Sequence, residues 1–237
     1  MMNTSLKQRL ANGQSVLMVN PNHVSATLAE KLTRSGADSI FIDCEHGAAG
    51  FEQLQLMAKA ARFGGGYTIV RPQSQDRSTI TRCLNCGADG VMVPLVHTAE
   101  SAREVVATIR YACPDDIDNK LVVVMIESTQ AIKNLDEILQ VEGIDVFFVG
   151  PGDLSQSMGY SPSVAPGVRR PQPVLDLVDN TLGRIRAAGK FAGTLVVREN
   201  VEHLVKVGAQ LLYYHADPFV VDGVNIMRGL STPVAAR

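Results

Sequence analysis

Several short apolar segments of this chain end in charged or titratable side chains. The segment FIDCEHG runs from apolar residues into Asp43, Glu45 and His46, and the segments TIVR and VVVMIE end in Arg71 and Glu127. Imidazole and carboxylate groups transfer protons, and the planar guanidinium of arginine can bind a carboxylate through two parallel hydrogen bonds. If these segments are strands of one sheet or barrel, their ends form a single site with this chemistry.

Two acidic residues have the spacing of a divalent-metal site. Glu127 ends one apolar segment and Asp153 follows the next, within GPGDLS. Neighbouring strands lie about 4.8 Å apart, so the two carboxylates could hold one ion between them. Such ligands suit Mg²⁺ or Mn²⁺, with Co²⁺ as a further option, and leave positions open for a substrate. Gly150 and Gly152 have no side chains, so we expect their backbone N–H groups to approach the ligand closely.

A repeated pattern predicts the elements that position these residues. In RSGADSIFID, NCGADGVMVP and VEGIDVFFVG, a helical stretch ends near a glycine and a continuous apolar segment follows. Glycine suits the left-handed cap of a helix, and continuous apolar segments are typical of strands covered on both faces. Strands are predicted at about 15–20, 39–44, 67–71, 90–95, 121–127, 146–150, 191–196 and 211–215. Eight strand–helix units predict an α/β fold, a (β/α)8 TIM barrel, as a single domain over residues 1–237.

A doubly wound open sheet is the alternative fold. That fold usually carries an early glycine-rich phosphate loop, which leads from a strand into a helix. The glycine-rich segment RFGGGYTIV leads instead from a helix into a strand. This order favours the barrel.

Two loop regions bear on the site that a barrel would form. The Ser-, Pro- and Gly-rich segment 155–173 follows the sixth predicted strand, so we interpret it as an active-site loop rather than a linker. The segments GTLVVREN and YYHADPF, at the last two strands, lack the glycine-rich anion site that phosphate-using barrels often have there. We therefore expect an unphosphorylated substrate.

The composition argues against several classes of partner. The formal net charge is −2 over 237 residues, which gives no electrostatic reason to expect nucleic acid or an anionic membrane. No apolar segment approaches the length of about 20 residues that spans a bilayer, and the first residues lack the apolar core of a signal peptide. We therefore expect a cytoplasmic protein.

The CLNC segment at 83–86 lacks a second pair of ligands, so we interpret its cysteines as ordinary thiols.

Each candidate site residue also has an ordinary structural interpretation. A lone acidic residue after a strand often caps the next helix, and Asp153 before LSQS could do only that. A lone histidine such as His46 is more often a hydrogen-bonded structural residue. The gathering of these residues at one predicted rim nevertheless favours a site over a set of independent structural roles.

The order of these motifs resembles the HpcH/HpaI aldolase/citrate lyase family of metal-dependent, class II pyruvate aldolases. The matching segments are FIDCEHG, VRP, GADGVMVPLVHTAESAREVV, MIEST and FVGPGDLSQSMGY, which together extend over most of the chain. The resemblance implies a carbon–carbon lyase that cleaves or forms a bond through a pyruvate-type enolate. Its substrate would be a small 2-oxo-4-hydroxy acid.

The resemblance also implies roles for the central residues. Glu127 and Asp153 would hold the ion, which would bind the keto and carboxylate oxygens of the 2-oxo acid. Arg71 would neutralise charge on the keto oxygen in the transition state. His46, acting through water, would be the general base on the aldol hydroxyl.

Other parts of the chain would support this site. By the same resemblance, Glu45 would orient metal-bound water and Asp43 would orient the region of His46. Family members are often hexamers with a swapped C-terminal helix, and the segment at about 218–230 would be that helix. The resemblance therefore implies a homo-oligomer, either a hexamer or a dimer with related interfaces.

Three departures from the family pattern leave the reaction open. Asn85 stands where many members have an aspartate that supports the histidine, and an amide cannot stabilise an imidazolium as a carboxylate does. Met125 replaces a common glutamine, and the segment 112–120 is short, so we expect one wall of the substrate site to be missing or rebuilt. Alternatives are a condensation as in citrate formation, a phosphonate or oxaloacetate-type lyase, and a non-catalytic protein that binds metal and oxo acid.

Overall fold

The chain forms a closed barrel in which each strand pairs with the next one along the sequence. The computed structural model describes residues 4–165 and 168–231. The strands are β1 (Val16–Asn20), β2 (Ser39–Asp43), β3 (Tyr67–Arg71), β4 (Gly90–Val93), β5 (Leu121–Ile126), β6 (Val146–Val149), β7 (Phe191–Leu195) and β8 (Ala209–His215). Every pairing is parallel, including that of β8 with β1. The predicted (β/α)8 barrel is therefore confirmed.

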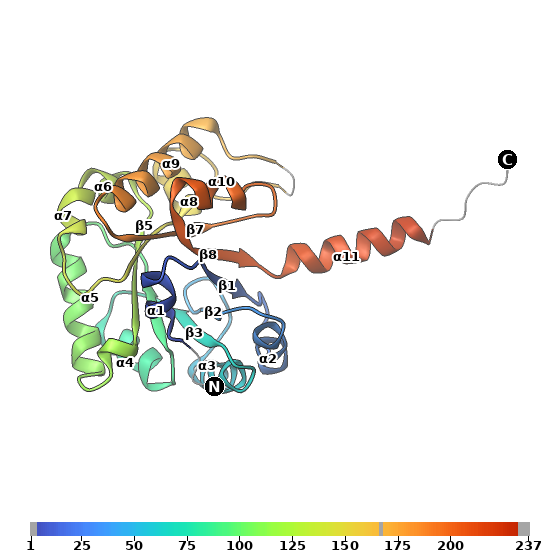
Figure 1. Cartoon of the computed structure of the whole chain (residues 1–237), viewed down its shortest axis with the longest axis horizontal. Coiled ribbons are helices and arrows are strands. Elements are labelled where there is room, and N and C mark those ends of the chain that lie inside the picture. Colours follow the sequence, from blue (N-terminus) through green and yellow to red (C-terminus); the bar gives the residue numbers. More distant parts are fainter. Residues whose placement is uncertain (1–3, 166–167, 232–237) are drawn as a thin grey trace.

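Helices connect successive strands and cover the outside of the barrel (Figure 1). They are α1 (Leu6–Ala11), α2 (Ala26–Arg34), α3 (Phe51–Phe63), α4 (Arg77–Asn85), α5 (Ala99–Ala112), α6 (Thr129–Lys133), α7 (Leu135–Leu139), α8 (Pro151–Ser157), α9 (Gln172–Ala187) and α10 (Val201–Val207), with a short 3₁₀ turn at Ile117–Asn119. Side-chain caps begin several of them: the hydroxyl of Ser25 accepts the Leu28 N–H at 3.2 Å. Such caps satisfy backbone donors that have no partner inside the helix.

The side chains of each strand alternate between two buried layers. Phe41, Ile69 and Phe148 belong to a cluster inside the barrel, whereas Ile40 and Val70 pack with the surrounding helices. Residues two apart on a strand face the same side. The interior cluster therefore identifies which side chains at the strand ends point into the mouth of the barrel.

Three aspartates close the opposite, N-terminal end of the barrel. Asp38, Asp89 and Asp145 each precede a strand and accept a backbone N–H from the strand before, at 2.8, 2.9 and 2.7 Å. Each lies in one of the repeated GAD or GID segments. The aspartate of this repeat thus links neighbouring strands of the barrel. The loops that contain the repeat lie at the end away from the candidate site.

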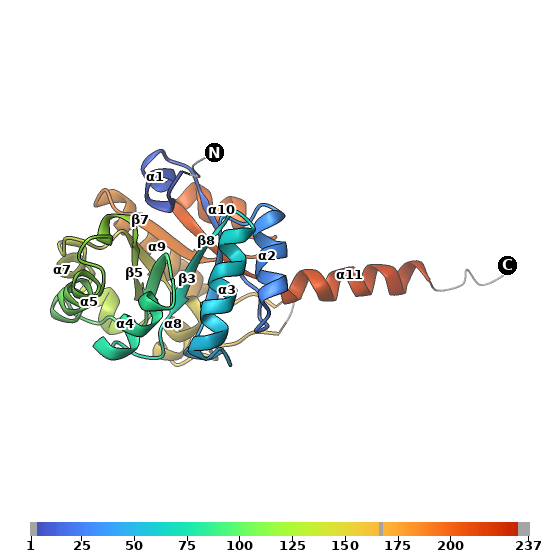
Figure 2. The same ribbon diagram turned by 90° about the horizontal axis from the view of Figure 1, so that it is seen from below.

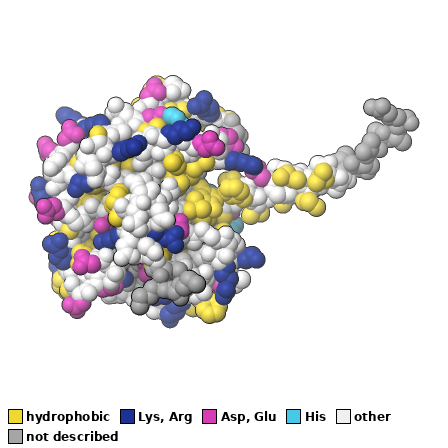
Figure 3. All heavy atoms as spheres, viewed as in Figure 1, with side chains coloured by type: hydrophobic (Ala, Val, Ile, Leu, Met, Phe, Trp, Pro, Cys, Tyr) yellow, Lys and Arg dark blue, Asp and Glu magenta, His cyan; other side chains and the backbone are white. Residues whose placement is uncertain are grey.

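Helix α11 (Asp217–Leu230) projects from the barrel, as both ribbon views show (Figures 1 and 2). It has no buried residue, although hydrophobic side chains lie along it (Figure 3). Its bounds agree with the predicted helix at about 218–230. In the described part of the chain, no helix combines the length and apolarity needed to cross a bilayer.

Candidate active site at the mouth of the barrel

The strands bring the candidate residues to one end of the barrel. Asp43 and Arg71 are register partners at the ends of β2 and β3, and Glu127 directly follows β5. Each lies two residues beyond a member of the interior cluster on its own strand. By strand alternation their side chains therefore point into the barrel mouth.

Arg71 is held between two carboxylates. Its Nε and one terminal nitrogen donate to the two oxygens of Asp43 at 3.0 and 2.7 Å, and its other terminal nitrogen lies 3.1 Å from Glu45 Oε2. Burial alone would raise the pKa of Asp43, but the hydrogen bonds and charge of Arg71 outweigh it and lower that pKa. Burial raises the pKa of Glu45, with Arg71 opposing it. The guanidinium is thus fixed in the mouth.

His46 follows this pair on an exposed turn. One oxygen of Asp43 accepts the backbone N–H groups of Glu45 and His46 at 3.1 and 3.2 Å, which fixes the turn. The His46 side chain is 65% exposed, and its Nε2 lies 3.8 Å from Glu45 Oε2. A proton-transfer group at this place can exchange protons with bulk water.

Glu127 is the most deeply buried acid of the site, with 2% exposure. Its Oε1 accepts the backbone N–H of Leu95 at 2.7 Å, whereas its Oε2 has no hydrogen-bond partner among the described residues. Burial raises the pKa of Glu127 to about 8, the Leu95 hydrogen bond opposes this, and repulsion from Asp153 adds to it. A buried carboxylate oxygen without a donor is costly unless a cation or a proton compensates it.

Asp153 lies in the first turn of α8, beside the active-site loop. Gly150, not Asp153, occupies the N-cap position of this helix, so Asp153 does not serve as the cap. Arg170, from the loop after α8, donates to Pro162 O at 2.9 Å. Burial lowers the pKa of Arg170, and the charge of Asp153 opposes this. Arg170 also donates to the Ser155 hydroxyl at 3.0 Å, which ties the predicted loop 155–173 to α8; residues 166 and 167 lie outside the described residues.

Gly150 contributes space rather than a hydrogen bond to a ligand. Its N–H donates to Ile126 O at 3.3 Å, so this donor is already used within the barrel, and close approach of a ligand to the backbone here stays a prediction. A Cβ at Gly150 would lie 2.8 Å from Glu127 Oε2 and 3.0 Å from Glu127 Cβ. The glycine thus leaves room for the carboxylate. Gly152 is within the first turn of α8, where backbone N–H groups have no acceptor inside the helix.

The chemistry of this donor set fits a divalent ion held by two carboxylates. Within residues 4–165 and 168–231, no group of three or more His, Cys, Asp and Glu side chains is arranged to hold a metal. Glu127 Oε2 is nevertheless buried without a donor, and the charge of Asp153 acts on the same carboxylate. An oxygen-seeking ion can take its remaining ligands from water and substrate. The two residues therefore suit Mg²⁺-like ions and not a closed protein cage.

The sequence interpretation missed a polar cluster at β8 and β1. Tyr213 and His215 lie two residues apart on the interior side of β8, and His215 is the register partner of Asn20. Asn20 Nδ2 donates to the Tyr213 hydroxyl at 2.9 Å. The segment YYH in the last strand was the available signal, because side chains two residues apart on a strand share a face and Tyr213 and His215 are two apart.

Two of the departures noted in the sequence lie far from the mouth of their own barrel. Asn85 is the exposed last residue of α4, and the segment 112–120 runs from the end of α5 to β5. Because each helix returns the chain to the N-terminal end of the barrel, neither can support His46 or form a wall of the site within one chain. Met125 is buried inside the barrel, two residues before Glu127.

The cysteines are unpaired thiols. Cys83 is buried, whereas Cys44, Cys86 and Cys113 are half-buried, and all four are free. Cys83 and Cys86 pack with the core between barrel and helices. This agrees with their interpretation as ordinary thiols.

A closed parallel barrel with acids and an arginine at the carboxyl ends of its strands defines the class of (β/α)8-barrel enzymes. The model of the HpcH/HpaI aldolase/citrate lyase family matches residues 14–216, and the chain belongs to this family. The predicted family is thereby confirmed. The enzyme class is that of a carbon–carbon lyase of the class II aldolase type, and aldolases of this family generally depend on a divalent metal ion.

Individual relatives agree with this assignment. The chain is 32% identical to 2-keto-3-deoxy-L-rhamnonate aldolase of Escherichia coli O9:H4 (strain HS), over 96% of this chain and 89% of that protein. Among solved structures, citrate synthase SbnG is 28% identical with a TM-score of 0.85, covering 96% of this chain and 97% of that one. The HpcH/HpaI aldolase from Desulfitobacterium hafniense DCB-2 has a TM-score of 0.82 at 23% identity, covering 98% and 99%; this last likeness concerns the fold.

Proposed function

We propose that the chain is an aldolase that joins a pyruvate-type 2-oxo acid to an aldehyde, or cleaves the 2-oxo-4-hydroxy acid product. The metal would be Mg²⁺ or Mn²⁺, with Co²⁺ as an alternative, held by Glu127 and Asp153. The similarity to an aldolase that acts on a 2-keto-3-deoxy sugar acid supports this substrate class.

The observation that carries the proposal is the buried Oε2 of Glu127, which has no hydrogen-bond partner among the residues that the structure describes. A glutamate that is 2% exposed loses its hydration, and a single hydrogen bond from Leu95 does not replace it. When bound, a divalent ion supplies the Lewis acidity that stabilises negative charge developing on the 2-oxo acid. The buried position of Glu127 excludes water from one side of this group and so strengthens the attraction.

Arg71 is positioned to bind a substrate oxygen. Asp43 accepts hydrogen bonds from its Nε and from one terminal nitrogen. Glu45 lies beside the other terminal nitrogen. A guanidinium has five N–H donors, and two of those of Arg71 bond to Asp43, so both terminal nitrogens keep an N–H for an oxygen in the mouth. A donor already fixed by two carboxylates needs no reorganisation during the reaction, which is the requirement for stabilising charge in a transition state.

His46 would move the proton of the aldol hydroxyl. Its exposed imidazole allows proton exchange with solvent, and its Nε2 lies 3.8 Å from Glu45 Oε2. Asp43 fixes the backbone of the turn. In this role Asp43 and Glu45 are positioning residues, and His46 reaches the substrate through water.

The test is proton NMR of the pyruvate methyl group in D2O with the enzyme and Mg²⁺. We expect the methyl signal to exchange at a rate that a chelator abolishes, because the aldolase must remove a methyl proton. Glu127→Gln should lose the exchange, whereas Glu104→Gln, at an exposed position of α5, should keep it. A wild-type protein that binds pyruvate and metal without exchange would refute the proposal and favour a non-catalytic role.

A condensation as in citrate formation is the second candidate. The observation in its favour is the 28% identity to citrate synthase SbnG across nearly the whole chain. It would use the same carboxylates and Arg71 with a different acceptor. Mass spectrometry of mixtures with pyruvate and an aldehyde, or with oxaloacetate and an acetyl thioester, distinguishes the two reactions by the product formed.

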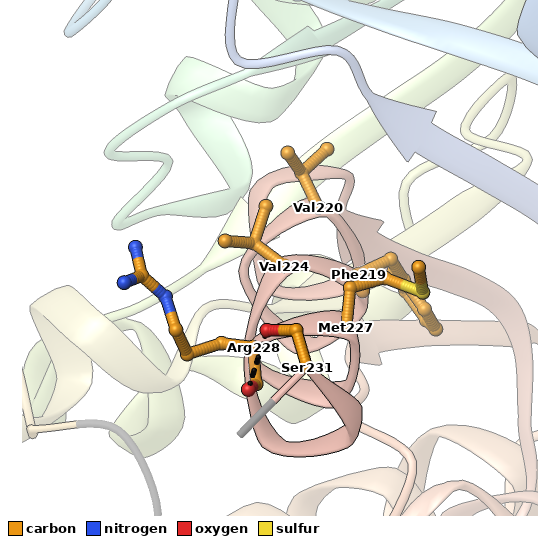
Figure 4. Close-up of a pocket in the computed structure, with 7 residues that line it drawn as sticks. Phe219, Val220, Val224, Met227, Arg228 and Ser231 are labelled. Carbon is orange, nitrogen blue, oxygen red and sulfur yellow. Dashed lines mark hydrogen bonds between the residues drawn. The ribbon is translucent and has the colours of Figure 1, made fainter. Parts of the chain in front are cut away.

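Assembly into a homo-oligomer is a further part of the proposal, with α11 exchanged between copies of a single barrel domain. Figure 4 shows Phe219, Val220, Val224 and Met227 projecting from this helix, and all four are exposed. Exposed apolar residues of this kind mark an interface. A second copy of the chain, as a dimer or a hexamer, would bury them.

A further inference from the structure

The polar cluster at β8 and β1 occupies the corner of the mouth farthest from the proposed metal ligands. Asn20 and His215 are register partners at the ends of β1 and β8, whereas Glu127 follows β5. In a barrel of eight strands in sequence order, β1 lies across from β5. A ligand that is bound at Glu127 and is long enough to cross the mouth would meet this corner with its other end.

Backbone donors fix the orientation of both amides in this cluster. The N–H of Asn22 donates to Asn20 Oδ1 at 2.8 Å, so Asn20 Nδ2 faces the Tyr213 hydroxyl. The N–H of Asp217 donates to Asn22 Oδ1 at 3.2 Å, so Asn22 Nδ2 faces His215 Nδ1, at 2.8 Å. With Nδ1 as an acceptor, neutral His215 carries its proton on Nε2.

This arrangement leaves the Tyr213 hydroxyl proton without an acceptor in the cluster. The oxygen accepts from Asn20 Nδ2 at 2.9 Å, and His215 Nε2 lies 3.4 Å away as a second, weaker donor. A phenol oxygen can accept two hydrogen bonds and must then donate its own proton elsewhere. The ring itself is fixed edge-on against Phe41 and Phe148, with centroids 4.9 and 6.0 Å away.

The cluster is uncharged at neutral pH. Burial raises the pKa of Tyr213 to about 12, with the Asn20 hydrogen bond opposing it. Burial also lowers the pKa of His215, which Asp217 and Asp43 oppose and Arg71 reinforces. Neutral amide, phenol and imidazole groups match hydroxyl or carbonyl oxygens of a ligand, and they offer little to a phosphate or a second carboxylate.

We propose that Asn20, Tyr213 and His215 form a subsite for the hydroxyl groups of the acceptor, so that the aldehyde is a short polyhydroxylated one. Tyr213 donates to an acceptor oxygen, and Asn20 and His215 position the phenol. This inference rests on the proposed aldolase function and deepens it, because it specifies the acceptor class and the residues that recognise it. The cluster lies opposite the metal ligands, so the two ends of the substrate are recognised independently.

The experiment compares glyceraldehyde with propanal as acceptors for pyruvate in the presence of Mg²⁺. The wild-type enzyme should have a higher kcat/KM for glyceraldehyde, and Tyr213→Phe should reduce the ratio of the two values about fivefold to tenfold, the effect of one lost neutral hydrogen bond. His215→Ala should reduce the same ratio. His203→Gln is the matched control, because His203 pairs with Asp179 on the outer surface.

The ratio also separates this inference from a failure to fold, since loss of folded enzyme lowers both rates equally. If pyruvate methyl exchange is absent from the wild type, the proposed function itself fails. If exchange occurs but the enzyme accepts both aldehydes equally or neither, the subsite inference is wrong while the donor site stands. An unchanged ratio in Tyr213→Phe, with the fold verified by circular dichroism, likewise overturns it.

Discussion

Replacing Glu127 with glutamine tests the metal site through two opposite effects. Glutamine has nearly the same shape and can still accept the Leu95 N–H, but it carries no charge and does not titrate. Metal binding should weaken at least tenfold, because a charged ligand is lost. The metal-free protein, in contrast, should become more stable at high pH, because the buried carboxylate no longer has to ionise.

The size of the second effect follows from the pKa of Glu127. That pKa is about 8 in the folded chain against an ordinary value of 4.5, so the metal-free folded state holds the proton more tightly than the unfolded state does. The contribution of Glu127 to the free energy of unfolding is therefore complete below about pH 4.5, and it is lost as pH rises through about 8. At 1.36 kcal/mol per pH unit, the loss reaches roughly 5 kcal/mol at most. Glu127→Gln removes this loss.

The assay is urea unfolding with a chelator at pH 5 and pH 9, together with calorimetry of Mn²⁺ binding. We expect Glu127→Gln to resemble the wild type at pH 5 and to exceed its stability by about 2 to 5 kcal/mol at pH 9. Glu104→Gln, on the exposed face of α5, is the control and should change neither quantity. Equal stabilities at pH 9 would refute the burial argument, and unchanged Mn²⁺ affinity would remove Glu127 from the metal site.

Three further changes test the neighbouring groups. Gly150→Ala should lower Mn²⁺ affinity at least tenfold in calorimetry, because the new Cβ would lie 2.8 Å from Glu127 Oε2; retained affinity would mean that the carboxylate has room to move. Asp43→Asn should lower kcat about tenfold or more with a smaller change in pyruvate affinity, because Arg71 loses the carboxylate that fixes it; equal changes in both would assign Asp43 a purely structural role. Val224→Asp should reduce the mass measured by light scattering, because it puts a charge in the proposed interface of α11; an unchanged mass would exclude that interface.

The barrel could be predicted because its signal is repeated and local. Each unit combines a glycine at a helix end, an aspartate and a continuous apolar segment, and the aspartates close the barrel by binding the preceding strand. The predicted strands agree with the observed ones to within about two residues at their ends. A pattern that recurs around a closed structure leaves few alternatives, even though each copy alone is ambiguous.

The site could be predicted in part, because strand ends are visible in sequence but their neighbours in space are not. Asp43 and Arg71 were placed at one rim correctly, yet their direct pairing at 2.7 Å depends on the register of β2 with β3. Asn85 ends α4, so within one chain it lies at the opposite end of the barrel from His46, and a comparison of motifs alone does not reveal this. His215 was missed because it is uncharged and lies in an aromatic segment, where only alternation reveals its direction.

The charges at the mouth predict that metal binding releases a proton. Arg71 pairs with Asp43, with Glu45 close by, and burial together with the charge of Asp153 disfavours an ionised Glu127, which the charge of Arg71 opposes only in part. Without metal, a proton on Glu127 relieves the repulsion from Asp153, since the pKa of Glu127 is about 8. A cation must displace this proton, because a ligand carboxylate has to be ionised. Calorimetry in two buffers of different ionisation enthalpy should find most of a proton released per ion at pH 7 and much less at pH 9; release that does not change with pH would show that Glu127 is already ionised and that another group compensates its burial.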